Sequence, residues 1–82
     1  MADINTRFQF LKMADDRLEE QHLSRDDAIN AVLNYTSKWT TTWGIEAIRG
    51  LALDNRPLKV YFEERAPTLI IIQNVAVIDL GG

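Results

Sequence analysis

Four acidic residues and the single histidine of the chain fall within one predicted helix, where they could bind a metal ion. The cluster consists of Asp15, Asp16, Glu19, Glu20 and His22. Glu19 and His22 have the Glu-x-x-His spacing of carboxylate-bridged di-metal bundles. That chemistry needs a second copy of the motif, and the chain has one histidine and no cysteine. We therefore expect no metal site. We interpret Asp15, Asp16, Glu19 and Glu20 as a solvated acidic patch, which could also meet a basic partner.

A hydroxyl nucleophile beside a histidine base is the second chemistry to consider, because Ser24 follows His22 by two residues. Neighbours in sequence cannot supply the geometry of a Ser-His-acid triad. The segment Ser24–Asp27 instead approximates a capping box at the start of a helix. No glycine-rich loop that could hold a phosphate is present. We therefore expect a protein that is not an enzyme and has no cofactor.

Three aromatic residues follow one another at intervals of four: Tyr35, Trp39 and Trp43. They could fill the core at a corner between two helices. They could instead form an exposed anchor, because tryptophan is enriched at the energetic centres of protein interfaces. We name all three as candidate partner-binding residues.

The spacing of apolar residues predicts helices at about residues 6–22, 25–38 and 43–53. Gly44 and Gly50 weaken the third helix by about 1 kcal/mol each relative to alanine. These two small residues could instead allow another element to approach closely.

Alternation of apolar and polar residues predicts a strand at about 58–63. A second apolar stretch at 68–80 is either one long bulged strand or two strands that meet at Gln73-Asn74, and we favour the continuous strand. The predicted fold class is α+β, in one domain spanning residues 1–82. Two or three N-terminal helices would pack on a small C-terminal antiparallel sheet of two or three strands.

The stretch 68–80 is apolar on both faces if it is a regular strand. One face would carry Leu69, Ile71, Val75 and Val77, and the other would carry Ile70, Ile72, Ala76, Ile78 and Leu80. An antiparallel sheet with one wet face should alternate instead. We expect the second face to be covered by another copy of the chain or by another protein, with Ile70, Ile72 and Ile78 at the contact.

The chain has a net charge of −3, and its basic residues do not form a stripe. We therefore do not expect binding to nucleic acid. The alternative is a winged-helix regulator of transcription, with helix 43–53 in the major groove. A basic surface around Arg49, Arg56, Lys59 and Arg65 would favour that alternative. An apolar patch around the sheet or the tryptophans would favour protein binding.

Composition and the N-terminal residues bear on the compartment. The absence of cysteine fits a reducing compartment, and the N-terminus shows no apolar signal segment. The longest apolar run, residues 69–72, is too short for a membrane-spanning helix. We expect a soluble, cytoplasmic protein.

The sequence has no motif by which we assign a family. The expected function is non-catalytic protein binding by a small regulatory, adaptor or inhibitor protein that associates with itself through its C-terminal sheet. Short, acidic chains without cysteine include viral inhibitors of host machinery, which is an analogy of size and composition.

Overall fold

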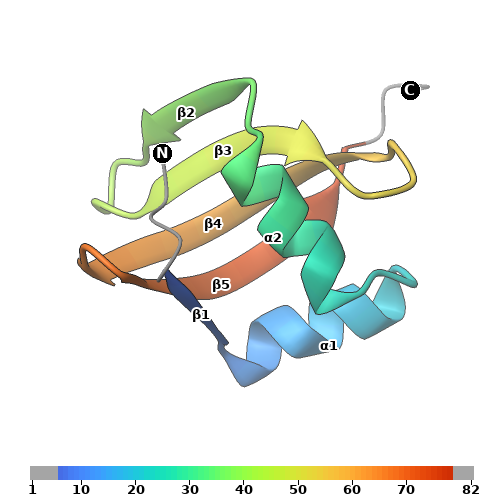
Figure 1. Ribbon diagram of the computed structural model, residues 1–82, viewed down its shortest axis with the longest axis horizontal. Coiled ribbons are helices and arrows are strands. Elements are labelled where there is room, and N and C mark those ends of the chain that lie inside the picture. The colour runs from blue at the N-terminus through green and yellow to red at the C-terminus, as the bar shows by residue number, and fades with distance from the viewer. Residues whose placement is uncertain (1–5, 79–82) are drawn as a thin grey trace.

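Residues 6–78 are described by a computed structural model, in which they form two helices and a five-stranded sheet (Figure 1). The elements are β1 (Arg7–Phe10), α1 (Lys12–Glu20), α2 (Arg25–Leu33), β2 (Ser37–Thr40), β3 (Glu46–Leu51), β4 (Pro57–Ala66) and β5 (Leu69–Val77). The strand order is β1-β5-β4-β3-β2, with β1 parallel to β5 and the other pairs antiparallel. The α+β class is confirmed. The sheet, however, is larger than predicted, is mixed, and begins before the helices.

The predicted third helix at 43–53 is wrong, because this segment forms a hairpin turn and β3. The N–H of Thr41 donates to the carbonyl of Ile45 at 2.8 Å, and the N–H of Gly44 donates to the carbonyl of Thr41 at 3.0 Å. Gly44 has a φ of 79°, in the left-handed region. This is the three-residue hairpin loop that ends in a left-handed glycine. The neighbouring threonines are β-branched and suit the strands.

Gly50 allows α2 to lie directly on β3. A Cβ atom at Gly50 would collide with the carbonyl oxygen of Ala31 and lie 2.8 Å from its Cα atom. The close approach that we considered for this glycine is therefore confirmed, although the element that it serves is a strand.

The N-terminal part of the first predicted helix is also wrong, because Arg7–Phe10 forms β1. Phe8 and Phe10 pack against the core, whereas Arg7 and Gln9 are exposed, which is the alternation of a strand. The helical stripe that we expected from residue 8 begins only in α1. The second helix likewise ends at Leu33 rather than near residue 38.

The prediction of a single continuous strand after residue 68 is confirmed, and this strand is β5. It ends at Val77, and residues 79–80 of the predicted strand lie outside the described part. Tyr61 pairs with Asn74 and Phe62 pairs with Ile72, so Gln73 forms a bulge. The bulge reverses the alternation. Val75 therefore faces the core together with Ile70 and Ile72 instead of facing away from them.

Both helices lie on one side of the sheet or at its edge, and together they cover a single face (Figure 1). α2 packs on β3 and β4, and α1 packs along β5. The largest fully buried side chains are those of Ile48, Leu58, Ile72, Val60 and Val75. The other face of the sheet, which we call the open face, has no helix of residues 6–78 on it.

Within residues 6–78, neither helix has the length and apolar character needed to cross a membrane.

Candidate functional site

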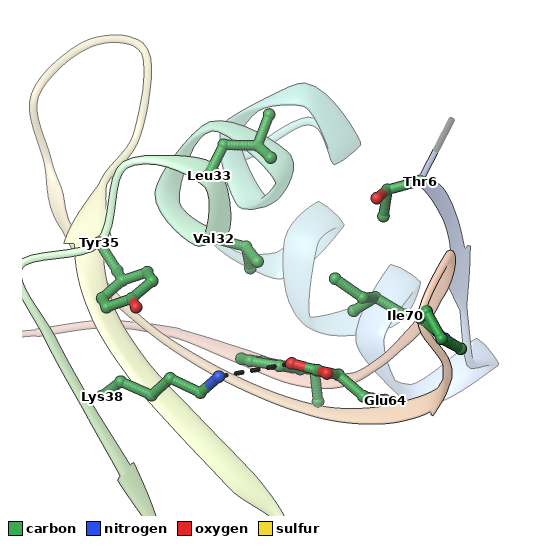
Figure 2. A pocket seen from close by; sticks show the side chains of 9 residues that line it. Thr6, Val32, Leu33, Tyr35, Lys38, Glu64 and Ile70 are labelled. Atoms are coloured by element: carbon green, nitrogen blue, oxygen red, sulfur yellow. Dashed lines mark hydrogen bonds and ion pairs between the residues drawn. The ribbon is translucent and has the colours of Figure 1, made fainter. Parts of the chain in front are cut away.

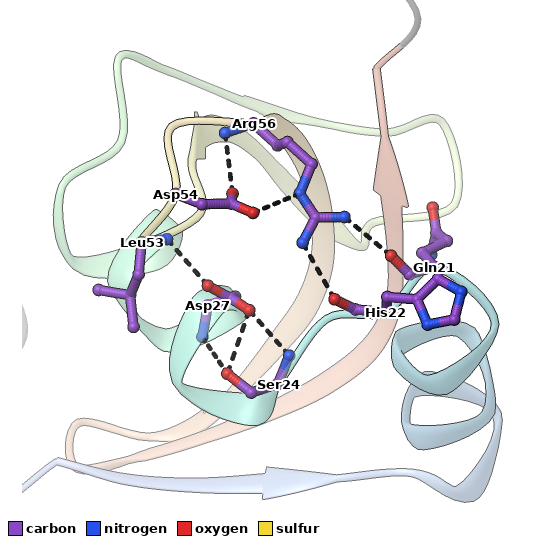
Figure 3. Close-up of polar contacts among 7 residues, drawn as sticks. All are labelled: Gln21, His22, Ser24, Asp27, Leu53, Asp54 and Arg56. Atoms are coloured by element: carbon purple, nitrogen blue, oxygen red, sulfur yellow. Dashed lines mark hydrogen bonds and ion pairs between the residues drawn. The ribbon is translucent and has the colours of Figure 1, made fainter.

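Ser24 and Asp27 form the capping box predicted at the start of α2 (Figure 3). The N–H of Asp27 donates to the Ser24 hydroxyl at 3.2 Å, and the Asp27 carboxylate accepts from the Ser24 N–H at 2.8 Å. The same carboxylate accepts from the N–H of Leu53 at 2.9 Å. These bonds to the backbone of Ser24 and Leu53 hold the pKa of Asp27 below its usual range, against the effect of burial. Ser24 is therefore a cap.

The backbone of His22 forms part of the C-terminal cap of α1. Its φ is 57°, and its N–H donates to the carbonyl of Glu19 at 3.1 Å. The N–H of Leu23 donates to the carbonyl of Leu18 at 2.8 Å. This is a Schellman motif with histidine in the position that glycine usually occupies.

Arg56 completes this group of polar contacts. Its guanidinium donates to the carbonyls of Gln21 at 2.8 Å and His22 at 3.0 Å, and it pairs with Asp54 at 2.8 Å (Figure 3). A cation is favourable at the C-terminus of a helix such as α1. We call Ser24, Asp27, Asp54 and Arg56 the polar junction, because they tie both helices to the β3–β4 turn.

Ion pairs offset most of the predicted acidic patch. Asp15 pairs with Arg25 at 2.7 Å, Asp16 with Lys12 at 3.1 Å, and Glu20 with Arg17 at 2.7 Å. The hydrogen bond from Arg25 lowers the pKa of Asp15. Across residues 6–78, no three acidic or histidine side chains are grouped so that they could hold a metal ion. The structure therefore gives this patch no feature beyond a charged helix surface.

The open face carries a row of aromatic side chains. The register places Trp39, Ala47, Tyr61 and Asn74 side by side on four adjacent strands. The Lys59 ammonium lies 5.5 Å from the ring centre of Trp39 and 5.5 Å from that of Tyr61. At these distances the ammonium interacts favourably with both rings. Ala47 is fully buried even though no helix covers this side.

A hollow of about 330 Å³ continues this row toward the β2–β3 turn. Its lining residues are Met13, Thr41, Trp43, Ile45, Tyr61, Gln73 and Asn74. Trp43 is 84% exposed and Met13 is 54% exposed. We call Trp39, Trp43, Tyr61, Met13 and Ile45 the aromatic patch. A solvent-exposed apolar surface with tryptophans is typical of a protein-binding site.

A second pocket, of about 270 Å³, lies on the helical side of the sheet (Figure 2). Tyr35 lines one wall, and Lys38 reaches Glu64 at 3.4 Å and Glu46 at 3.6 Å. Burial alone would lower the pKa of Lys38, but the two carboxylates raise it by more. This group holds two carboxylates and one ammonium, so it leaves one negative charge unbalanced beside the pocket.

The predicted partner-binding residues fall into two groups. Tyr35, Trp39 and Trp43 are exposed, at 44%, 36% and 84%, so the interpretation of Trp39 and Trp43 as core residues is wrong. Ile70 and Ile72 are 6% and 0% exposed. The prediction that they lie at a contact surface is wrong, because the helices already cover them.

Ile78 is half-buried beyond the end of β5. Ile71, rather than Ile70 or Ile72, lies on the open face, where it pairs with Glu63. Sequence reasoning also missed Tyr61 and Ile45. The alternation of Lys59 and Tyr61 with buried residues was a signal for Tyr61, since it places that ring on the outer face of β4.

The basic side chains that would favour DNA binding are largely engaged elsewhere. Arg56 belongs to the polar junction, Arg65 pairs with Glu63 at 2.7 Å, and Lys59 lies over two aromatic rings. Arg49 is exposed on the open face. The surface around these residues therefore combines a few cations with aromatic rings and is not a basic stripe.

The chain matches no protein-family model, and no curated protein or solved structure matches it.

Proposed function

We propose that this protein is a small non-catalytic protein-binding domain of the regulatory, adaptor or inhibitor kind, and that it associates with itself through its sheet. The observation that carries the proposal is the aromatic patch around the 330 Å³ hollow on the open face. Trp43 at 84% exposure offers a large anchor that a partner could bury. Tryptophan and tyrosine gain more from such burial than most side chains, because few rotatable bonds are fixed.

The neighbouring groups support a protein rather than a small molecule as the ligand. The hollow is shallow and mostly apolar, and one group of each of its amides is engaged: Gln73 donates to Glu63 at 3.3 Å, and Asn74 accepts from the Val75 N–H at 2.9 Å. A pocket for a small molecule usually directs several free polar groups at its ligand.

The test is affinity capture from a lysate of the cells that make the protein, with the wild type and two variants. Trp43→Ala removes the anchor of the aromatic patch. Leu53→Ala is the matched control, because Leu53 is 62% exposed at the β3–β4 turn, away from the hollow. We expect one protein to be captured by the wild type and by Leu53→Ala and lost with Trp43→Ala, with or without nuclease.

Capture that is equal for all three proteins would contradict the proposal, as would capture that nuclease abolishes. The second result would point to nucleic acid. A winged-helix regulator would need a recognition helix at residues 43–53, where the chain forms a turn and β3. No specific observation favours that alternative.

A further inference from the structure

The two sides of the sheet end differently. At the β5 side, the Gln21 side chain takes the place of a strand beyond the end of β1. Its amide donates to the Val75 carbonyl at 2.9 Å, and its oxygen accepts from the Val77 N–H at 2.7 Å. β1 is the edge strand here, and beyond its end α1 lies along β5, so a strand added to that part of β5 would meet the helix (Figure 1).

The opposite side ends in β2, whose outer edge is bonded to no other strand of residues 6–78. All four residues of β2 are exposed. The three exposed aromatic residues of the chain's described part, Tyr35, Trp39 and Trp43, lie on β2 or next to its ends. A strand added here would therefore cover open backbone groups and approach exposed aromatic surface at the same time.

We propose that β2 pairs antiparallel with β2 of a second copy of this chain, with Trp39 of each copy directly opposite the other. This inference deepens the self-association part of the proposed function and names its partner and its contact. Two sheets joined in this way would form one continuous sheet, and the two open faces would lie on the same side.

The backbone determines which groups are available. The N–H of Thr41 bonds to the carbonyl of Ile45, so Thr41 faces β3. Because hydrogen bonding alternates along an antiparallel strand, the backbone N–H and C=O groups of Trp39 also point toward β3. Those of Lys38 and Thr40 point outward, away from β3. These outward groups are the ones that a second copy must pair.

Two-fold symmetry leaves two registers centred on β2. If the axis passes Lys38, Lys38 lies opposite Lys38 and Thr40 lies opposite Thr36, which is outside β2, so the outward groups of β2 form only two hydrogen bonds. If the axis passes Trp39, Lys38 lies opposite Thr40 of the other copy and their outward backbone groups can form four hydrogen bonds. The two tryptophans then occupy a non-hydrogen-bonded pair, where side chains are closest.

The charge of Lys38 does not oppose this register. Its ammonium is directed to the helical side of the sheet, where it pairs with Glu64 and Glu46. The strand is short, so the contact is small and the dimer should be weak, with a dissociation constant on the order of 0.1 mM.

The first test compares two Thr→Pro variants by sedimentation and NMR between about 20 µM and 2 mM. Thr40→Pro removes an outward N–H that the second copy needs, and it leaves the bonds to β3 in place. Thr42→Pro is the matched control, because proline suits the first central position of the β2–β3 turn. We expect the wild type and Thr42→Pro to dimerise alike and Thr40→Pro to dimerise at least about tenfold more weakly, with an unchanged circular dichroism spectrum.

The second test determines the register and does not depend on the folding of a proline variant. The chain has no cysteine, so a single introduced cysteine reports on one contact. Under mild oxidation, Trp39→Cys should form a covalent dimer readily. Ser37→Cys should not, because residue 37 would lie opposite Thr41 of the other copy.

A protein that stays monomeric to 2 mM would overturn the inference, as would equal cross-linking at positions 37 and 39. A dimer that Trp43→Ala abolishes and Thr40→Pro leaves intact would place the contact on the open face and refute pairing at β2. A peptide strand from another protein would appear as capture that Thr40→Pro abolishes without any self-association. Loss of self-association in Thr40→Pro with retained partner capture would separate this inference from the proposed function.

Discussion

Asp27 should contribute more to stability than any other acidic residue of the helices. Its carboxylate accepts hydrogen bonds from the backbone N–H groups of Ser24 and Leu53, at 2.8 and 2.9 Å, and it is only 8% exposed. In Asp27→Asn one oxygen becomes an NH₂ group, so one of the two N–H donors faces another donor. A hydrogen bond to a charged group contributes about 1.5–3 kcal/mol, so we expect a loss of about 2–3 kcal/mol.

Asp26→Asn is the matched control. Asp26 is the adjacent residue in the first turn of α2, is exposed, and shares the favourable interaction with the helix dipole. Its loss should cost about 0.3–1 kcal/mol. Urea unfolding followed by circular dichroism measures both differences. In a domain of this size, each kcal/mol corresponds to a change in melting temperature of about 4–8 °C.

The pH dependence separates the hydrogen-bonded charge from simple packing. The pKa of Asp27 in the folded protein lies below the usual value of 3.8, so its ionised form stabilises the fold above that value. This contribution is lost as the pH falls through the lowered pKa of the folded state. The gap between wild type and Asp27→Asn should therefore be full at pH 6 and narrow at pH 2. A gap that does not change with pH, or one no larger than for Asp26→Asn, would refute the reasoning.

Four further substitutions test the local structure. His22→Gly should stabilise the protein by about 0.5–1 kcal/mol in urea unfolding, because residue 22 has a φ of 57°; no gain would contradict the Schellman motif. Gly50→Ala should lower the free energy of unfolding by at least about 1–3 kcal/mol, because the new methyl group collides with Ala31. Gly44→Ala has open space around it but a φ of 79°, so it should lower this free energy by about 1–2 kcal/mol. A smaller loss at position 50 than predicted would argue against close packing of α2. Gln21→Ala should cost about 1–3 kcal/mol and accelerate hydrogen exchange at the Val77 amide, and unchanged exchange would count against the strand-like role of Gln21.

Local signals in the sequence were sufficient for some elements. The hydrogen bonds of the capping box join Ser24 and Asp27, which are three residues apart, so the start of α2 could be predicted from Ser24–Asp27. β4 could be predicted because Leu58, Val60 and Phe62 alternate with outward-facing residues on one covered face. The continuity of β5 followed from the weak turn signal at Gln73-Asn74.

Other elements depend on distant partners that no local pattern reveals. β1 is four residues long and exists as a strand because it pairs in parallel with β5, about 60 residues away. Its Phe8 and Phe10 fit a helical stripe as well as a strand. Ile45, Ile48 and Leu51 also fit a helical period, and the strand depends on pairing with β2 and β4 and on packing of α2 against Gly50.

The error at 43–53 had the largest effect on the predicted site. A helix there would have placed the two tryptophans at a corner between helices, where core filling was the ordinary interpretation. The hairpin instead places Trp39 on an edge strand and Trp43 in an exposed turn. The misassigned segment therefore supported only the core interpretation, and the alternative of an exposed anchor agrees with the exposure of both side chains.

Stability and surface chemistry are carried by different residues in this protein. The polar junction and the core lie on the helical side, where most side chains are needed to hold the fold. Trp43 is 84% exposed, so the fold gains little from its ring, and a polar residue would serve the β2–β3 turn equally well. Under the proposed function, a partner would bury this ring. The edge of β2 differs from the part of β5 beyond β1, which Gln21 and α1 cover.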